Sequence, residues 1–153
     1  MTAARFALHP YDAAHLPELT DLWIAAWTKA MPAIDFEARR TWFVGHLVAL
    51  RDAGVEIICA FDPSSGTMAG FITLDRSTGH IDQLAAAPAY WSAGAADALM
   101  GEAKRRARHL KLDVNQDNPR AVRFYEKHGF RRRAAGANPS SGLKTWHYEW
   151  SRG

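Results

Sequence analysis

The residues from 118 to 130 are the part of this chain whose types and spacing best suit chemistry. Asn118 can cap the first turn of a helix with its side-chain oxygen, and Pro119 suits the first helical position because no backbone donor is lost there. Gly129 can take the left-handed conformation that ends a helix. One face of this helix carries residues at spacing i, i+3, i+4 and i+7, namely Ala121, Phe124, Tyr125 and His128. Tyr125 could be a proton donor held in a cleft, or a core residue with its hydroxyl at the surface.

The elements that must position this helix form a mixed α/β pattern. Helices are expected at 11–29, 35–52, 94–109 and 118–128, with Asp35 a plausible cap for the second. Strands are expected at 5–8, 55–61, 68–75, 80–86, 110–114, 130–133 and 143–150, and a loop at 136–142. The three strands from 55 to 86 are separated by turn signals and indicate an antiparallel meander. We find no repeat and no linker, so residues 1–153 are expected to form one domain.

The composition favours a globular protein with a real core. Of its 153 residues, 48% are hydrophobic and 23% charged, and no apolar run approaches the length of a membrane helix. The N-terminal stretch MTAARFALHP has no signal-peptide apolar segment. Cys59 is the only cysteine, which agrees with a cytoplasmic location, and its strand-like surroundings indicate a core residue. The seven histidines show no paired ligand spacing, so no metal site is expected.

The segment from Asn118 to Phe130 has the pattern Asn-x-x-Ala-x-x-Phe-Tyr-x-Lys-x-Gly-Phe. This pattern resembles the last signature block of the GNAT superfamily of N-acetyltransferases. Residues 81–90 are similar to that superfamily's central strand and following turn. The resemblance runs in order from about Cys59 to about Phe130. It implies a GNAT-like fold, with a central, mostly antiparallel sheet flanked by about four helices. This sheet would splay in a V where the strand at 80–86 parts from the strand at 110–114.

The resemblance places the pyrophosphate loop of acyl-coenzyme A just before the third helix. Small residues and free N–H groups at a helix start suit a diphosphate. The expected loop comprises Trp91, Ser92, Ala93, Gly94, Ala95 and Ala96. Gly94 and Ala96 match the family pattern, whereas Trp91 stands where Gln or Arg is expected and Ser92 where glycine is common. Trp91 could still offer its backbone N–H, and its indole could stack beside the cofactor.

The resemblance also implies that backbone groups of Leu84 and Ala86 pair with pantetheine, and that the Asn118 side chain contacts acetyl-CoA. Tyr125 would be the general acid, since a neutral phenol is protonated at physiological pH. Asp82 lies two residues before Leu84 and would share its strand face, with Gln83 on the other face. Asp82 could deprotonate the amine, attract a cationic substrate, or be a plain solvent-facing residue.

The acceptor pocket is expected at the two N-terminal helices and the loop between them. Its candidates are Trp27, Asp35 and Trp42, with Trp23, Phe43 and Glu37 as neighbours. Aromatic residues at helical spacing are more often core, but any that face the cleft would suit an amine with an apolar or aromatic body.

The charge distribution leaves two interpretations of the basic residues. The net charge is +3, and basic side chains cluster at 104–111 and 131–133. Most are expected on a solvated helix face, while a cofactor-binding role stays open for Lys104, Arg120, Arg123 and Lys127. A nucleic-acid-binding domain is disfavoured because no recognition motif is present.

The sequence thus predicts an N-acetyltransferase that moves an acetyl group from acetyl-CoA to a primary amine of a small molecule or protein. The alternative is a non-catalytic module that binds acyl-CoA as a sensor or partner subunit. No membrane or nucleic-acid partner is expected. One face of the last strand carries Trp146, Tyr148 and Trp150. Core packing of this face is expected, and a homodimer that uses it stays open.

Overall fold

The computed structural model describes residues 5–153, so the first four residues of the MTAARFALHP stretch lie outside it. The helices are α1 (Leu16–Ala30), α2 (Arg40–Asp52), α3 (Ala95–Arg106) and α4 (Pro119–Lys127). The strands are β1 (Ala7–Pro10), β2 (Glu56–Phe61), β3 (Met68–Leu74), β4 (Leu84–Ala86), β5 (His109–Asn115), β6 (Arg131–Ala137) and β7 (Lys144–Ser151). Short 3₁₀ turns precede α1, α2 and α3. This order of strands and helices is the one that the sequence predicts.

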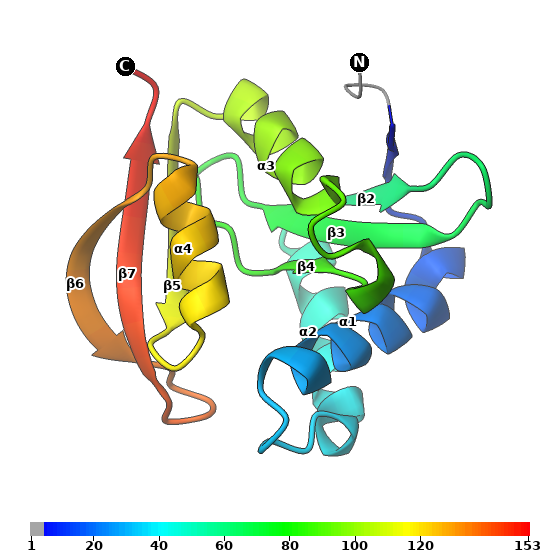
Figure 1. The fold of residues 1–153 in the computed structure, drawn as a ribbon, viewed down its shortest axis with the longest axis horizontal. Coiled ribbons are helices and arrows are strands. Elements are labelled where there is room, and N and C mark those ends of the chain that lie inside the picture. Colours follow the sequence, from blue (N-terminus) through cyan, green and yellow to red (C-terminus); the bar gives the residue numbers. More distant parts are fainter. Residues whose placement is uncertain (1–4) are drawn as a thin grey trace.

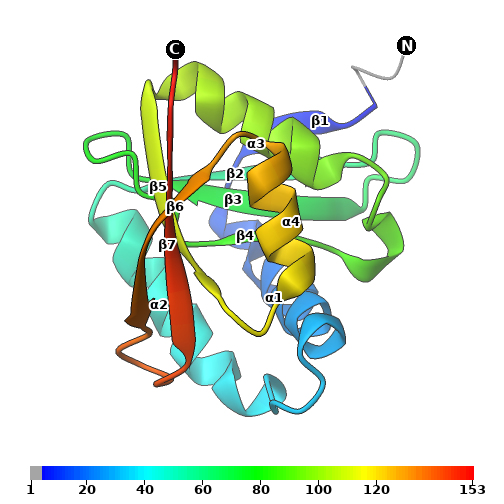
Figure 2. The same cartoon turned by 60° about the vertical axis from the view of Figure 1, so that its left-hand side comes forward.

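The strands form two antiparallel sheets, one in the order β1-β2-β3-β4 and one in the order β5-β7-β6. The helices α1 and α2 lie on one side of the first sheet and α3 lies on the other (Figure 1). The helix α4 lies in front of β5 in Figure 1, and the turned view shows it to the right of β5 and β7 (Figure 2). The predicted mixed α/β class is confirmed.

The two sheets meet at one short junction between the turn before β4 and the middle of β5. The N–H of Ile81 donates to the carbonyl of Lys111 at 2.9 Å, and the N–H of Lys111 donates to the carbonyl of Gly79 at 2.9 Å. His80 and Lys111 form a parallel bridge, and beyond it no ladder joins β4 to β5 in the described chain. The sheet therefore splays from this point, as the resemblance implies.

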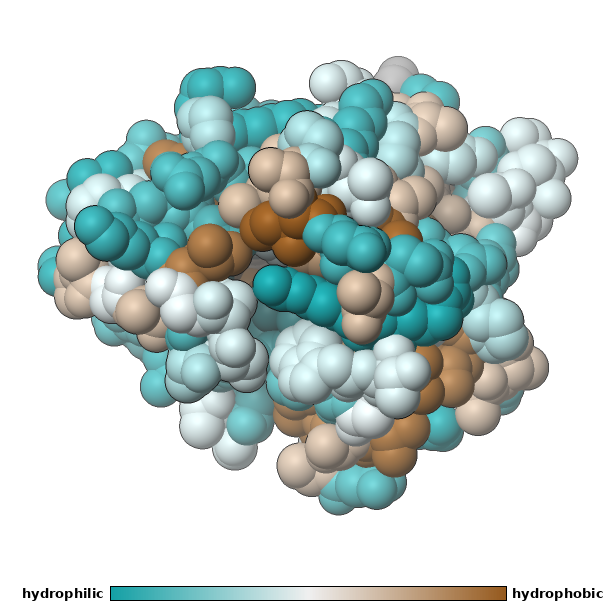
Figure 3. Space-filling model, turned by 90° about the horizontal axis from the view of Figure 1, so that it is seen from below, coloured by the Kyte–Doolittle hydropathy of each residue, from teal (hydrophilic) through white to brown (hydrophobic). Residues whose placement is uncertain are grey.

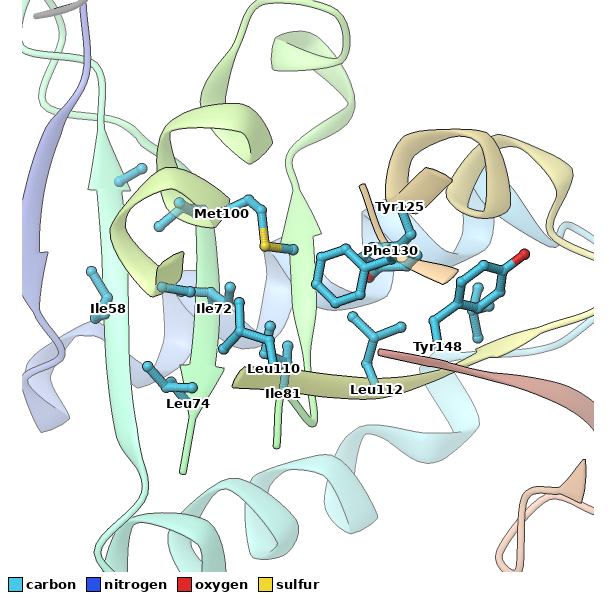
Figure 4. Packing of buried hydrophobic residues seen from close by; sticks show 14 residues of the cluster. Ile58, Ile72, Leu74, Ile81, Met100, Leu110, Leu112, Tyr125, Phe130 and Tyr148 are labelled. Carbon is cyan, nitrogen blue, oxygen red and sulfur yellow. The ribbon is translucent and has the colours of Figure 1, made fainter. Parts of the chain in front are cut away.

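Two clusters of buried side chains hold the layers together. Residues of α1 and α2 pack on one face of β2 and β3, and residues of α3 pack on the other. The second of these clusters continues across the junction, where Leu110 and Leu112 of β5 meet Phe130 and Tyr148 (Figure 4). Because this core is shared by both sheets, it fixes the angle at which they splay.

Cys59 is fully buried in the cluster under α1 and α2. Burial, with a smaller contribution from the charge of Glu18, raises the pKa of its thiol to about 12. The prediction of a core residue is confirmed, because a thiol with this pKa is not a nucleophile at neutral pH.

The last strand packs as expected. Tyr148 is fully buried, and its hydroxyl donates to Glu126 at 2.7 Å. Trp146 and Trp150 are partly buried against the same cluster. Core packing of this face is therefore confirmed. The predicted loop at 136–142 begins later than expected, since Gly136 and Ala137 belong to β6.

The predicted strand at 80–86 is wrong in its first half. Only Leu84–Ala86 form β4. The hydroxyl of Thr73, which is fully buried, accepts the N–H groups of both Asp82 (3.1 Å) and Gln83 (2.9 Å). A side-chain oxygen thus replaces the backbone carbonyl that a regular ladder would use, and the strand begins four residues later than predicted.

Two further findings concern membranes and metals. Among residues 5–153, no helix combines the length and apolarity needed to cross a bilayer. Within the same range, no three His, Cys, Asp or Glu side chains gather as a metal site.

Replacing Gly79 by alanine should destabilise the sheet junction. Gly79 has φ +79°, and a Cβ there would lie 2.1 Å from the carbonyl oxygen of His109. We expect Gly79→Ala to lower the free energy of unfolding by about 3 kcal/mol, through backbone strain and this clash together. Chemical denaturation measures the change.

Gly66→Ala is the matched control for that substitution. Gly66 has φ +74° but open space around its Cβ position, so only the left-handed strain of about 1 kcal/mol applies. Equal losses for the two variants would show that the junction is not closely packed at Gly79.

Candidate active site

Two cavities open between the splayed sheets, with volumes of about 500 Å³ and 330 Å³. We name the larger the phosphate-side cavity and the smaller the acceptor-side cavity. Their common wall consists of Trp27, Leu84, Asn118, Ala121 and Tyr125. Seen from below, the surface is hollowed between the two halves of the molecule (Figure 3). The cavities therefore meet at Tyr125.

The start of α3 supplies unpaired donors to the phosphate-side cavity. Ser92 (φ +67°) and Gly94 (φ +98°) are both left-handed, which turns the chain sharply before the helix. The N–H groups of Ser92, Gly94, Ala95 and Ala96 have no hydrogen-bond acceptor in residues 5–153. Such a cluster at the positive end of a helix dipole fits a diphosphate.

Not every residue of the predicted loop contributes in this way. The N–H of Trp91 donates to Pro88 at 3.2 Å, and the N–H of Ala93 donates to Tyr90 at 3.1 Å. Ala93 and Ala95 also lie outside the cavity wall, whereas Ser92, Gly94 and Ala96 line it. The expectation that Trp91 offers its backbone N–H is therefore wrong, because a turn ahead of α3 already uses that donor.

The phosphate-side cavity is positively charged. Its wall includes four cationic side chains, those of Lys29, Arg120, Arg123 and Lys127. Its one carboxylate, Asp97, accepts from His128 at 2.7 Å and pairs with Lys127 at 3.3 Å. Burial alone would raise the pKa of Asp97, but these hydrogen bonds lower it below its usual value. Such a surface attracts a polyanion.

Lys104 and His128 do not serve this surface as free cations. The ammonium of Lys104 donates to the carbonyl of His128 at 2.6 Å and lies 5.0 Å from the ring centre of Trp150. Burial lowers the pKa of Lys104 and also that of His128, although Asp97 opposes the latter shift. Lys104 is outside both cavity walls.

The strand β4 presents backbone groups to the cavity. The backbone groups of Gln83 and Ala87 point to β3. The Thr73 N–H donates to the carbonyl of Gln83, and the Ala87 N–H donates to the carbonyl of Ala69. In an antiparallel ladder these groups alternate in direction, so those of Leu84 and Ala86 face away from β3. Both residues line the phosphate-side cavity. An extended ligand could pair with them as an added strand.

The indole of Trp91 occupies one of these backbone acceptors. Its Nε1 donates to the carbonyl of Ala86 at 2.8 Å. The guanidinium carbon of Arg120 lies 3.8 Å from the indole centre, and the Lys29 ammonium lies 4.7 Å from it. Burial and the charge of Arg123 lower the pKa of Arg120. Trp91 thereby links α1, the loop before α3 and α4.

The helix α4 begins and ends where the sequence predicts. The Asn118 side-chain oxygen accepts from the N–H of Ala121 at 3.2 Å, and Gly129 is left-handed at φ +87°. The Nδ2 of Asn118 donates to no group in residues 5–153, and Asn118 lines both cavities. Asn118 can therefore cap the helix and still donate to a ligand.

Tyr125 is positioned by α4 between the cavities. Its ring packs on Phe124 and Phe130, yet its hydroxyl makes no hydrogen bond to residues 5–153 and is not sealed from solvent. Burial raises the pKa of the phenol. The hydroxyl therefore keeps its proton throughout the physiological range and can serve as a donor.

The acceptor-side cavity combines aromatic and acidic side chains. Trp27, Trp42 and Phe36 line it together with two carboxylates, Asp82 and Asp113, and one guanidinium, that of Arg39. Trp42 is 46% exposed and lies at the rim. The loop between β6 and β7 closes the opposite side with Asn138, Ser140 and Ser141.

The other predicted acceptor residues divide between core and cavity. Phe43 is fully buried outside both cavity walls and is a core residue. Trp23 stacks on Phe43 with ring centres 4.2 Å apart and is only 4% exposed, yet it also lines the acceptor-side cavity. Asp35 lies outside both cavity walls, and its carboxylate accepts from the N–H of Ala38 at 3.2 Å. This capping role before α2 uses the Asp35 carboxylate, so Asp35 does not join Trp27 and Trp42 in the wall of the acceptor-side cavity.

Asp82 has a partner that the sequence analysis missed. The Nε2 of His46, in α2, lies 2.6 Å from Asp82 Oδ2. Gln83 donates from its Nε2 to the same oxygen at 3.0 Å and lines the acceptor-side cavity, so it does not point away from Asp82 as predicted. The one sequence signal for His46 is its spacing of four residues from Trp42, which places both on one face of a helix.

The sequence is similar to a known protein family and to a curated enzyme. Residues 16–130, more than half of the chain, match the acetyltransferase (GNAT) family. This protein belongs to the GNAT acetyltransferase family. The chain is 26% identical over 136 residues to the peptidyl-lysine N-acetyltransferase YiaC of Escherichia coli, covering 88% of this chain and 90% of that protein.

Solved structures share the GNAT fold. A GCN5-related N-acetyltransferase from Rhodopseudomonas palustris has a TM-score of 0.77 at 20% identity, covering 99% of this chain and 98% of that one. The PaiA N-acetyltransferase from Thermoplasma acidophilum, solved with coenzyme A, has a TM-score of 0.73 at 18% identity over 95% and 98% of the two chains. The predicted GNAT fold and acetyl-CoA-dependent N-acetyltransferase class are confirmed.

Within this GNAT domain, loss of the Trp91 donor should strengthen coenzyme A binding. If pantetheine pairs with the outward carbonyl of Ala86, the indole N–H competes with it. Trp91→Phe keeps a ring beside Arg120 and Lys29 but removes the donor. Since one neutral hydrogen bond contributes about 1 kcal/mol, we expect roughly fivefold tighter binding by calorimetry.

Ser92→Ala is the control for that substitution, because it alters the same loop without touching the indole. Weaker binding by Trp91→Phe, with Ser92→Ala unchanged, would show that the indole is a contact for the cofactor and not its competitor.

Proposed function

We propose that this GNAT protein transfers the acetyl group of acetyl-CoA to a primary amine, with Tyr125 as the general acid and Asp82 as the base. The cofactor would lie in the phosphate-side cavity and the amine in the acceptor-side cavity. The observation that carries this proposal is the shared wall, because Tyr125 borders both cavities and its hydroxyl is free of protein partners in the described chain.

The phosphate-side residues fit the cofactor's charges. The free N–H groups of Ser92, Gly94 and Ala96 would hold the diphosphate, with Arg120, Arg123 and Lys127 around it. The outward carbonyl of Leu84, and the outward groups of Ala86 once the indole leaves, would pair with the pantetheine amides. The Nδ2 of Asn118 is available as a further donor.

Bound acetyl-CoA supplies an activated acyl carbon and a thiolate leaving group. Asp82 would take one proton from the ammonium group, which leaves a neutral amine to form the C–N bond. The Leu84 N–H would donate a hydrogen bond to the carbonyl oxygen as charge builds on it. Tyr125 would give its proton to sulfur as the C–S bond breaks, and recover the second proton that the nitrogen loses.

The acceptor-side cavity suits a cationic amine on an apolar stem. Asp82 and Asp113 provide negative charge, and Trp27 and Trp42 provide aromatic walls. A lysine side chain has this chemistry, and the relative YiaC carries the name peptidyl-lysine N-acetyltransferase. Small primary amines with an apolar body share it, so both classes belong in the first substrate panel.

Tyr125→Phe should lower turnover without weakening cofactor binding. Removal of a general acid typically lowers rates by about 100-fold or more, while the ring that lines the cavity is retained. The measurement is kcat for acetyl transfer to the amine panel, beside calorimetric affinity for acetyl-CoA. Unchanged kcat would exclude the acid role.

Tyr148→Phe is the matched control, since it removes a buried tyrosine hydroxyl that bonds to Glu126 outside both cavities. It should lose stability but not turnover. Wild-type protein that binds acetyl-CoA and acetylates no amine in the panel would favour the alternative, a non-catalytic acyl-CoA-binding module.

A further inference from the structure

We propose that His46 is a positioning residue for the base, which holds Asp82 with one carboxylate oxygen turned to the amine. This inference rests on the proposed function and adds a residue that the resemblance does not supply. It begins with an asymmetry at Asp82. Both side-chain hydrogen bonds to this carboxylate, from His46 at 2.6 Å and from Gln83 at 3.0 Å, end on Oδ2.

The other oxygen of Asp82 is available to a substrate. No side chain or backbone donor in residues 5–153 bonds to Oδ1, although Asp82 lines the acceptor-side cavity. With Oδ2 held by two donors, the carboxylate cannot rotate freely, and Oδ1 keeps one orientation. A fixed acceptor is what proton transfer from an ammonium group requires.

The two donors are themselves fixed. Gln83 accepts from the indole Nε1 of Trp23 at 3.1 Å, which sets its amide so that Nε2 points to Asp82. The backbone N–H of Asp82 donates to the buried hydroxyl of Thr73. The ring of His46 stacks on Trp42, with centres 4.7 Å apart and planes 11° apart. Asp82, Gln83 and His46 are thus each held in place by a contact with a residue outside this group of three.

Contacts from Trp42 to His46 and from His46 to Asp82 connect a residue of the cavity wall to the proposed base. Trp42 lines the acceptor-side cavity on one side of α2 and covers the imidazole with its ring. His46 reaches from α2 to Asp82, which lies two residues before β4. When Nε2 carries its hydrogen, it donates to Oδ2 and leaves Oδ1 to the cavity.

Other charged or titratable groups share the acceptor-side cavity with Asp82. They are Arg39 from the turn before α2, Asp113 from β5 and Tyr125 from α4. Asp113 pairs with His147 at 2.9 Å. Turnover must therefore be compared between variants of His46, in which these groups stay constant.

His46→Leu should reduce kcat by 10-fold or more, on the order of the lower end of general-base effects, with little change in KM. His46→Gln, whose amide can reach a similar position, should recover most of kcat.

A double-substitution cycle separates positioning from general loss of structure. In an Asp82→Asn background, His46→Leu should have no further effect on kcat, because His46 acts through Asp82. Additive losses would overturn the proposal, as would an unchanged kcat in His46→Leu. A His46→Gln variant as slow as His46→Leu would also overturn it, since the imidazole itself would then be needed.

A readout without turnover keeps this inference separate from the proposed function. In ¹⁵N NMR of the wild-type protein, the His46 ring should carry its hydrogen on Nε2, and Asp82→Asn should change that ring-nitrogen signal. If no amine is acetylated but this change occurs, the proposed function fails while the His46–Asp82 pairing stands. An unchanged His46 signal in Asp82→Asn overturns the pairing.

Discussion

The hydrogen bonds between residues 79–81 and Lys111 are the constraint on which the site depends. They join the two sheets at one point and allow no ladder beyond it in the described chain. The outward groups of β4 consequently lack a strand partner, which leaves an edge that an extended ligand can complete. The core around Leu110 and Leu112 then holds this opening at a set width.

The site separates charge along the opening. Cationic side chains and free helix N–H groups line one end, and carboxylates with aromatic rings line the other. A polyanionic donor and a cationic acceptor would thus be drawn to opposite ends. They would meet at Tyr125, where burial keeps the phenol protonated. The same helix that presents Tyr125 also presents Asn118 to both cavities, so one element aligns the two substrates.

The sequence predicts what depends on neighbouring residues. The cap at Asn118, the stop at Gly129 and the order of strands and helices follow from local signals, and the structure has them all.

Features that depend on distant residues were not predictable in this way. The hydroxyl of Thr73 shortens β4 from the neighbouring strand. The indole of Trp91 turns back to Ala86, and the pairing of His46 with Asp82 spans 36 residues of sequence. Asp35 looked equally suited to capping and to substrate contact, and only its position in three dimensions separates the two.

The most direct test of this account is a map of backbone amide shifts by NMR as acetyl-CoA is added. The account expects the largest changes at Ser92, Gly94, Ala95 and Ala96, with further changes at Leu84 and Ala86 along the edge of β4. Saturating cofactor that leaves these amides unmoved, or shifts only residues away from the opening between the sheets, would contradict it.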